Sequence, residues 1–297
     1  MARRRTTLYQ ILAMLWRIVR KHPALLPVFL LAGGAGYGYE VMVARPTMVY
    51  AGLPQARDWR QPSTWVRIFR NHGFMLGYSD LRGNPLWVSY KLDPVSEHAG
   101  SYPRPQRFKS DWRNFNLINH DSYSGSGYDR GHMAPNYAIS RLYGRTAQED
   151  SFLVSNISPQ KPKLNQKLWQ RLEEVEIEYF AKRYHPLWVY AGPIFKSHGK
   201  RLKSSWLIEV PTAFYKIYAA PAAAKGMPPR LLAFIMPQKV KGNEPLDRYL
   251  VSVDEVETRT GFDFFSELDD RLEQTLEARV DAEAWHLKDV ARLPARY

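Results

Sequence analysis

The stretch DRGHMAPNY, residues 129–137, organises this sequence. It places a carboxylate, an arginine, a turn-forming glycine and a histidine within four consecutive residues. The imidazole of His132 can take a proton from water near neutral pH, and the guanidinium of Arg130 can pair with phosphate oxygens. We interpret the stretch as the edge of an active site suited to phosphodiester hydrolysis. The competing interpretation is a turn whose Asp–Arg pair is a surface ion pair.

A series of downstream segments changes the balance in favour of the active site. DRGH is followed by SNISPQ at 155–160, LNQ at 164–166, Trp169 and then Leu172-Glu173. This series resembles the DNA/RNA non-specific endonuclease family, the ββα-metal nucleases that include the endonuclease G type. The likeness extends over roughly residues 60–270 through RFK at 107–109, VYAGPIF at 189–195, VPTAFYK at 210–216 and VDEVE at 253–257. The whole ordered series is a specific signal, whereas DRGH alone would be a weak one.

The resemblance implies roles for five residues. They are His132 as the general base that deprotonates the attacking water, Arg130 and Arg107 as phosphate contacts, Asn165 as the direct metal ligand, and Glu173 as the residue that holds water around the metal. The implied ion is Mg²⁺, with other divalent ions such as Mn²⁺ as alternatives, because Mg²⁺ prefers oxygen donors and keeps several waters. Asp129 is expected to orient the loop.

Helical spacing is visible after the LNQ segment. Apolar residues at 164, 168, 172, 175 and 179 predict a helix from about 163 to 183 with that stripe against the core. Asn165, Trp169 and Glu173 have the same spacing on the adjoining stripe. One helix can therefore aim an amide oxygen and a carboxylate at the same small volume. Asn156 is expected to fix the site through hydrogen bonds.

The predicted fold class is α+β, with a mixed, largely antiparallel central sheet flanked by helices. The active-site element is expected to be a ββα-metal unit made of the DRGH region, a strand at 152–157 and the helix at 164–183. Apolar or alternating runs predict further strands at 74–78, 86–92, 187–191, 206–210, 213–218 and 231–236. Trp188 and Trp206 are expected in the core.

We divide the chain into a basic N-terminus with an anchor or signal at 1–43, a linker at 44–62 with three prolines, and a nuclease domain at 63–297. The charge-rich end after Phe264 is predicted to be mainly helical.

The N-terminal region contains an uncharged apolar run at residues 23–39. A membrane helix needs at least about 17 such residues, and the positive charges before the run predict that its N-terminal side is cytoplasmic. We therefore expect a single-pass inner-membrane anchor with the catalytic domain in the periplasm. The alternative is a cleaved signal peptide and a secreted or periplasmic enzyme. Glycines at 33, 34, 36 and 38 argue against a buried globular helix.

Composition limits the chemistry. The chain has 42 Lys+Arg against 29 Asp+Glu, a formal net charge of +13, which favours a polyanionic partner such as nucleic acid or an anionic membrane. It has no cysteine, which excludes disulfides, zinc-thiolate sites and thiol nucleophiles. In the loop from 107 to 115, basic residues alternate with aromatic ones, as a phosphate-tracking surface could use. His198 is a further contact candidate.

The expected partners are DNA and RNA, cleaved with little base specificity, and a membrane contacted through residues 23–39. The sequence leaves open whether the protein forms a homodimer. Two rival functions are a catalytically silent nucleic-acid-binding protein, which would be expected to lack His132 or Asn165, and a membrane-surface scaffold that uses its charge for lipid contact.

Overall fold

The computed structural model describes residues 8–197, 199–224 and 226–294. His198 lies outside the described residues. The chain divides into two compact units, Met1–Thr47 and Met48–Tyr297. The first contains α1 (Leu8–Lys21), α2 (Leu25–Tyr39) and the π-helical turn η1 (Glu40–Ala44). The helical stretch Leu25–Met48 is 24 residues long and apolar enough to cross a membrane, a property that signal sequences share.

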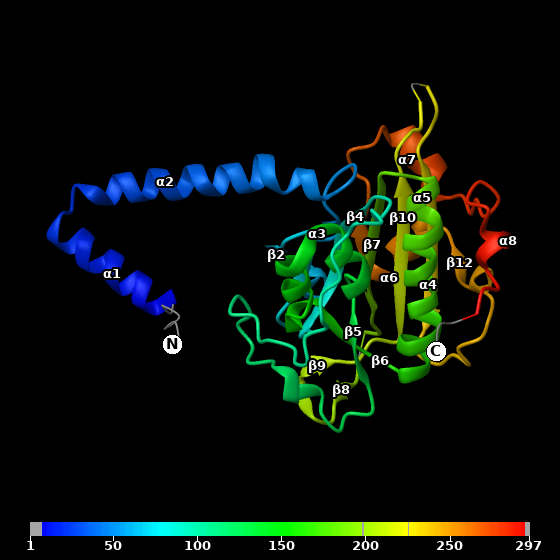
Figure 1. Cartoon of the computed structure of the whole chain (residues 1–297). Helices are drawn as coiled ribbons and strands as arrows, with labels where there is room; N and C mark the ends of the chain where they lie inside the picture. The colour runs from blue at the N-terminus through cyan, green and yellow to red at the C-terminus, as the bar shows by residue number, and fades with distance from the viewer. Residues whose placement is uncertain (1–7, 198, 225, 295–297) are drawn as a thin grey trace. The chain divides into compact units, whose positions relative to one another are not determined.

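The second unit is built on a seven-stranded sheet in the order β12-β11-β10-β7-β4-β3-β2, with every neighbouring pair antiparallel (Figure 1). The strands are β2 (Arg67–Arg70), β3 (Phe74–Ser79), β4 (Asn84–Leu92), β7 (Leu187–Ile194), β10 (Ala213–Ala220), β11 (Arg230–Pro237) and β12 (Leu250–Val251). The predicted α+β class with a largely antiparallel sheet is confirmed.

Helices cover both faces of this sheet, because successive side chains of a strand point to opposite sides. On β10, Phe214 and Tyr218 belong to the core that includes the helix after residue 164, whereas Tyr215 and Ile217 belong to the other core. The first face carries α3 (Asn136–Ser151), α4 (Gln170–Val175), α5 (Ala181–Arg183) and α8 (Leu287–Val290); the second carries α6 (Val253–Thr260) and α7 (Asp270–Glu277) (Figure 1).

The segment 44–62, predicted as a linker, contributes contacts to the second unit from Met48 onward. Val49 is buried in the core on the α6–α7 face. The short strand β1 (Gln55–Ala56) pairs with β13 (Phe262–Asp263). These contacts fasten the start of the unit to its C-terminal part.

The partner strand of DRGH lies later than predicted. β5 (Asp129–His132) pairs with β6 (Ile157–Gln160), not with a strand at 152–157. Residues Val154–Asn156 form a 3-10 turn, in which Ser155 Oγ donates to Asp111 and Asn156 bonds across to Ala134. Hydrogen bonds from these side chains to distant groups compete with the backbone pairing of a regular strand. The apolar run at 152–154 does not show that such bonds form.

The helix predicted at 163–183 is confirmed, but its apolar stripe changes direction. It runs through η6 (Leu164–Trp169), α4, η7 (Glu176–Phe180) and α5, with Leu164, Leu168, Leu172 and Val175 buried. Tyr179, expected in the same stripe, is exposed, and Phe180 is buried instead. Both η6 and η7 are π-helical, and wider turns advance the buried position by a residue relative to a 3.6-residue period.

Trp206, predicted in the core, is 77% exposed. It lies on β9 (Ser205–Glu209), which pairs with β8 (Arg201–Leu202) in a separate two-stranded ribbon outside the central sheet. A two-stranded ribbon leaves one face to solvent, which the sequence pattern of β9 does not show.

Candidate active site

The hairpin of β5 and β6 positions the DRGH residues. Gly131 pairs with Ser158 and His132 with Ile157. A Cβ on residue 131 would lie 2.0 Å from Oε1 of Gln160, so only glycine leaves room for that buried side chain. The packing of the hairpin therefore requires glycine at position 131. Arg130 and His132, on either side of it, lie at one edge of the domain.

Asn156 fixes the chain immediately after His132, as predicted. Its backbone oxygen accepts from Met133 N at 3.0 Å, and its Oδ1 accepts from Ala134 N at 2.9 Å. Its Nδ2 donates to the carbonyls of Ala134 and Ser151 at 3.0 and 2.9 Å. All these bonds are buried, where a lost hydrogen bond leaves unsatisfied groups. Asn156 thereby sets the direction in which His132 leaves the strand.

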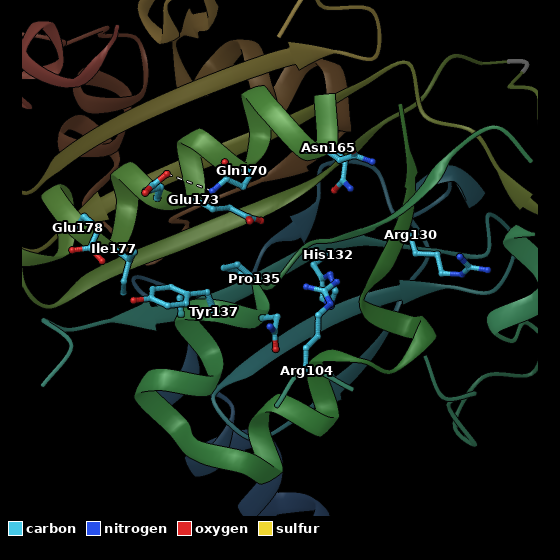
Figure 2. Close-up of a pocket in the computed structure, with 14 residues that line it drawn as sticks. Arg104, Arg130, His132, Pro135, Tyr137, Asn165, Gln170, Glu173, Ile177 and Glu178 are labelled. Atoms are coloured by element: carbon cyan, nitrogen blue, oxygen red, sulfur yellow. Dashed lines mark hydrogen bonds between the residues drawn. The ribbon is translucent and has the colours of Figure 1, made fainter. Parts of the chain in front are cut away.

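The predicted residues meet in a pocket of about 440 Å³ between this hairpin, the start of α3 and the helix from 164 (Figure 2). Figure 2 shows His132 on one side of the pocket and Asn165 and Glu173 on the other, on the helix. Arg130 also lines the pocket, whereas Arg107 does not. Arg104 also lines the pocket, although no motif in the sequence marks it.

His132 is 9% exposed and packs against two rings, with Phe108 and Phe152 centroids 5.2 and 4.9 Å away. Burial, with a smaller effect of the Arg104 charge, lowers the pKa of His132 to about 3. The imidazole is therefore neutral at physiological pH. Its Nε2 makes no hydrogen bond to any described residue, which suits a group that takes its partner from water or substrate.

Asn165 is oriented from the hairpin. Asp129 Oδ2 accepts hydrogen bonds from Asn165 Nδ2 at 2.9 Å and from Gln166 Nε2 at 2.8 Å. With the amide nitrogen turned to Asp129, the amide oxygen of Asn165 is the atom left for the pocket. Asp129 thus orients two side chains of the helix in addition to its own loop.

The residues of the pocket fit a hard divalent cation. Asn165 and Glu173 lie on the same face of the helix, about two turns apart, along one wall of the pocket. The Asn165 amide oxygen and the Glu173 carboxylate are both oxygen donors of the kind that Mg²⁺ prefers. Burial and the neighbouring Glu176 raise the pKa of Glu173 to about 8, against the opposing effect of Lys216. A cation beside this carboxyl would favour its ionised form, so binding of the cation and loss of the proton are coupled.

A buried ion pair holds this helix on the sheet. Glu176 and Lys216 are both fully buried, with Lys216 Nζ 2.7 Å from Glu176 Oε2. Tyr218 donates to the same oxygen at 2.9 Å, and Tyr90 donates to Oε1 at 2.9 Å. Lys216 Nζ also lies 4.7 Å from the ring centroid of Trp169. Trp169 precedes Glu173 by one helical turn. The pair therefore connects β4 and β10 to the helix three residues after Glu173.

The three arginines near the pocket differ in what holds them. Arg130 donates to the His120 carbonyl from Nε and Nη2, and its side chain points away from His132 in Figure 2. Arg107 forms an exposed ion pair with Asp121 at 3.0 Å. Arg104 lies with its guanidinium 5.1 Å from the Phe152 ring centroid, beside His132. Because Arg104 and Arg107 are three residues apart in one loop, no spacing rule selects the one that reaches the pocket.

The other basic residues of this loop are also paired. Lys109 Nζ lies 3.0 Å from Glu149, and Arg113 bonds Asp111 at 2.6 Å. The aromatic residues between them, Trp112 and Phe115, are 76% and 79% exposed. The loop therefore exposes two aromatic rings to solvent, whereas its basic groups form ion pairs with carboxylates.

Comparison with known proteins gives a consistent result. The DNA/RNA non-specific endonuclease family matches residues 61–271. A nuclease from Nostoc sp. is 31% identical over 217 residues, 70% of this chain and 76% of the relative. Human mitochondrial endonuclease G is 30% identical over 203 residues, 64% of this chain and 67% of the relative. A chain in the crystal structure of an EndoG/EndoGI complex shares the fold, with a TM-score of 0.63 at 22% identity, over 76% of this chain and 93% of that chain.

Arg104 and Arg107 form a matched pair for testing which arginine faces an anion in the pocket. We expect Arg104→Met to weaken binding of inorganic phosphate about 10-fold or more, since a hydrogen bond to a charged group is worth about 1.5–3 kcal/mol. Arg107→Met should change the affinity by less than about twofold, because Arg107 is exposed and paired with Asp121. Isothermal titration calorimetry measures the phosphate affinity of both variants. Equal losses of affinity would show that Arg107 contacts the anion as Arg104 does.

Proposed function

Because this chain belongs to the DNA/RNA non-specific endonuclease family, we propose roles in phosphodiester hydrolysis for the residues that meet in its pocket. The chain is a non-specific nuclease that acts on the phosphodiester bonds of DNA and RNA. The observation that carries the proposal is the convergence of His132, Asn165 and Glu173, from a hairpin and a helix, on one pocket of about 440 Å³.

His132 is the general base in this proposal. Its imidazole is neutral above a pKa of about 3, so it can accept a proton without first losing one. A base with so low a pKa is weak, but a phosphodiester anion in the pocket favours the imidazolium and raises that pKa when the base is needed. Asn156 holds the backbone after His132, so the imidazole approaches the substrate from a fixed direction.

Family membership implies a divalent metal-dependent nuclease, and we assign the ion as Mg²⁺ held through Asn165. When bound, the ion offsets charge on the phosphoryl oxygens and assists departure of the 3′ oxygen. Asp129 keeps the Asn165 amide turned toward the pocket. Glu173 accepts hydrogen bonds from water in the pocket and orients that water.

Arg104 and Arg130 supply positive charge to the phosphate. Arg104 does so from the wall beside His132, and Arg130 from the edge of the pocket, where its backbone-bound guanidinium also holds the preceding loop. A second phosphate contact from Arg107 stays a prediction from the sequence. Since these groups address phosphate and not base edges, cleavage with little sequence preference follows.

The first test is cleavage of plasmid DNA and of RNA by the full-length protein in detergent, with Mg²⁺ and with EDTA. We expect His132→Ala to lower the rate about 10²–10⁴-fold, the usual contribution of a positioned general base, while DNA binding stays near that of the parent. His98→Ala is the matched control, because His98 is exposed and outside the pocket.

A parent protein that binds DNA but does not cleave it with Mg²⁺ would favour the binding-protein alternative. Full activity in the His132 variant would show that the base is another group.

The second test concerns the metal and uses pH. Since the pKa of Glu173 is about 8 without a cation, the Mg²⁺ concentration needed for half-maximal rate should fall as pH rises from 7 to 9, by up to about 10-fold per pH unit below that pKa. Glu173→Gln should remove this pH dependence, and Asn165→Ala should raise the Mg²⁺ requirement at every pH. A Mg²⁺ requirement unchanged in Asn165→Ala would point to a different ligand.

The N-terminal apolar helix suggests a signal sequence or an anchor. Of the two we favour an uncleaved anchor that leaves the nuclease unit on the non-cytoplasmic side. Arg17, Arg20 and Lys21 precede the apolar stretch, and positive charge of this kind is retained on the cytoplasmic side. Formation of a homodimer stays a prediction from the sequence.

A reporter enzyme that is active only after export, fused after Gln55, tests this topology. We expect activity from the fusion in cells and retention of the full-length product in the membrane fraction. Replacing Arg17, Arg20 and Lys21 by glutamine should lower the reporter activity. An inactive reporter would overturn the orientation, and a shortened, soluble product would identify a cleaved signal.

A further inference from the structure

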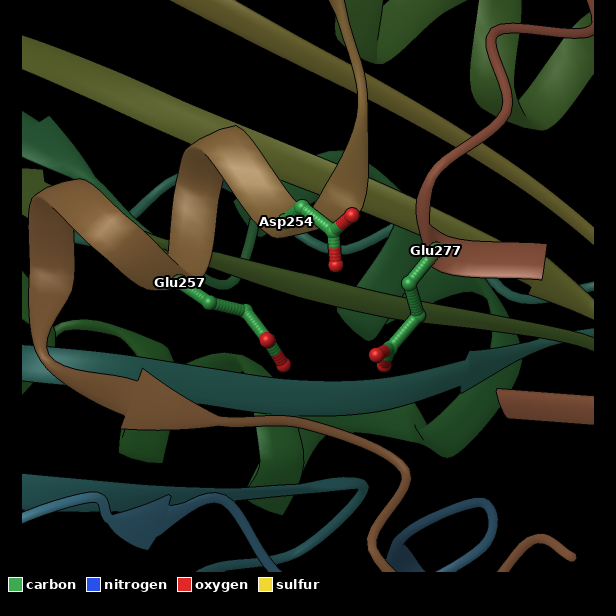
Figure 3. Close-up of side chains that lie close together, drawn as sticks. All are labelled: Asp254, Glu257 and Glu277. Atoms are coloured by element: carbon green, nitrogen blue, oxygen red, sulfur yellow. The ribbon is translucent and has the colours of Figure 1, made fainter. Parts of the chain in front are cut away.

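Three carboxylates gather between α6 and α7, outside the active site. Asp254 and Glu257 come from α6 and Glu277 from the end of α7, and their side chains point toward one another in Figure 3. One carboxylate oxygen from each lies within 4.8 Å of the others. The helices α6 and α7 pack on the opposite face of the central sheet from the helix that carries Asn165.

Two of the three side chains are buried, and one lacks a partner. Glu257 is 3% exposed, and its Oε1 accepts a hydrogen bond from Phe264 N at 2.7 Å. Glu277 is 4% exposed, and its Oε1 makes no hydrogen bond to any described residue. A buried carboxylate oxygen without a partner is costly unless a proton or a cation compensates it.

The surroundings add negative charge. Asp263 and Glu273 act on the cluster with the same sign, and Arg57 is the basic residue that acts on Glu257. Burial raises the pKa of Glu257 to about 7, and burial together with the neighbouring carboxylates raises that of Glu277 to about 9. This concentration of carboxylates stands out in a chain whose formal net charge is +13.

We propose that Asp254, Glu257 and Glu277 bind a hard divalent cation of the Ca²⁺ type, separate from the ion of the active site. Ca²⁺ takes carboxylate oxygens at about 2.3–2.6 Å in flexible geometry, so two of its ligands can be about 4.8 Å apart. The observed separations fall within this limit. Mg²⁺ demands shorter, octahedral contacts, and Zn²⁺ favours nitrogen and sulfur donors, so both fit these three carboxylates less well.

The site would have a structural effect, because its ligands come from two helices. Leu276, next to Glu277, is buried in the same core as Val253 and Val256 of α6. A cation that bridges Glu257 and Glu277 fastens α7 to α6 and replaces carboxylate repulsion with attraction. It binds the folded chain and not the unfolded one, so it stabilises the fold by mass action.

Thermal unfolding of the full-length protein in detergent, followed by circular dichroism after removal of metals, tests the proposal with Ca²⁺ alone. At a 100-fold excess over Kd we expect Tm to rise by about 5–10 °C for a domain of this size. Glu277→Gln should abolish the rise while leaving cleavage by the Mg²⁺-loaded enzyme unchanged. Glu273→Gln, on the same helix but outside the three ligands, should retain it.

The conservative Glu277→Gln variant replaces a buried acidic group, whose pKa is raised to about 9, by a neutral amide, so its Tm in EDTA should equal or exceed that of the parent. A Ca²⁺ effect that persists in this variant would place the cation elsewhere and overturn the proposal. So would a parent whose Tm in EDTA rises as pH falls from 9 to 6 and does not respond to Ca²⁺, since protons would then be the compensating charge.

Discussion

The buried pair of Glu176 and Lys216 is the interaction on which the arrangement of the pocket depends. Removing two charges from water is expensive, and the cost is offset only when the partners are close and their remaining groups are bonded. Here both conditions hold, since Tyr90 and Tyr218 donate to the same carboxylate. The result is a directional connection between the helix and two strands of the central sheet, which apolar packing alone would not provide.

This connection determines where the helix presents Asn165 and Glu173. The π-helical turns on both sides of α4 change the phase of the helix, so its apolar and polar faces do not follow one regular stripe. Glu176 lies on the sheet side and Glu173 on the pocket side, less than one turn apart. Lys216, which lies 2.7 Å from Glu176, also acts on Glu173 and opposes the rise in its pKa that burial causes.

A second connection joins the helix to the hairpin. Asp129 begins β5 and accepts from Asn165 and Gln166, so the strand that carries His132 also orients the amide across the pocket. Asn156 holds the other end of that strand. His132 and Asn165 thus belong to one hydrogen-bonded frame, which is the kind of preorganisation that the proposed catalysis by positioning requires.

The distribution of charge separates two regions of the protein. Arg104, Arg130 and His132 line the pocket on one face of the sheet, where the polyanionic substrate is expected, and carboxylates concentrate between α6 and α7 on the other. Like charge would repel nucleic acid from these carboxylates. The acidic region is free to serve stability.

The sequence alone was sufficient for the family and for most local elements: the DRGH motif, the helical spacing of Asn165 and Glu173, and the pattern of the antiparallel strands are each encoded by neighbouring residues. The tertiary structure decided what depends on distant contacts. Strand β6 lies after residue 156 because Asn156 and Ser155 bond to groups far along the chain. Tyr179 is exposed because of a π-helical turn, Arg104 reaches the pocket where Arg107 does not, and Glu277 meets Asp254 and Glu257 across two helices. A local pattern records periodicity and residue type, but these outcomes depend on which side chain finds space and a partner once the chain has folded.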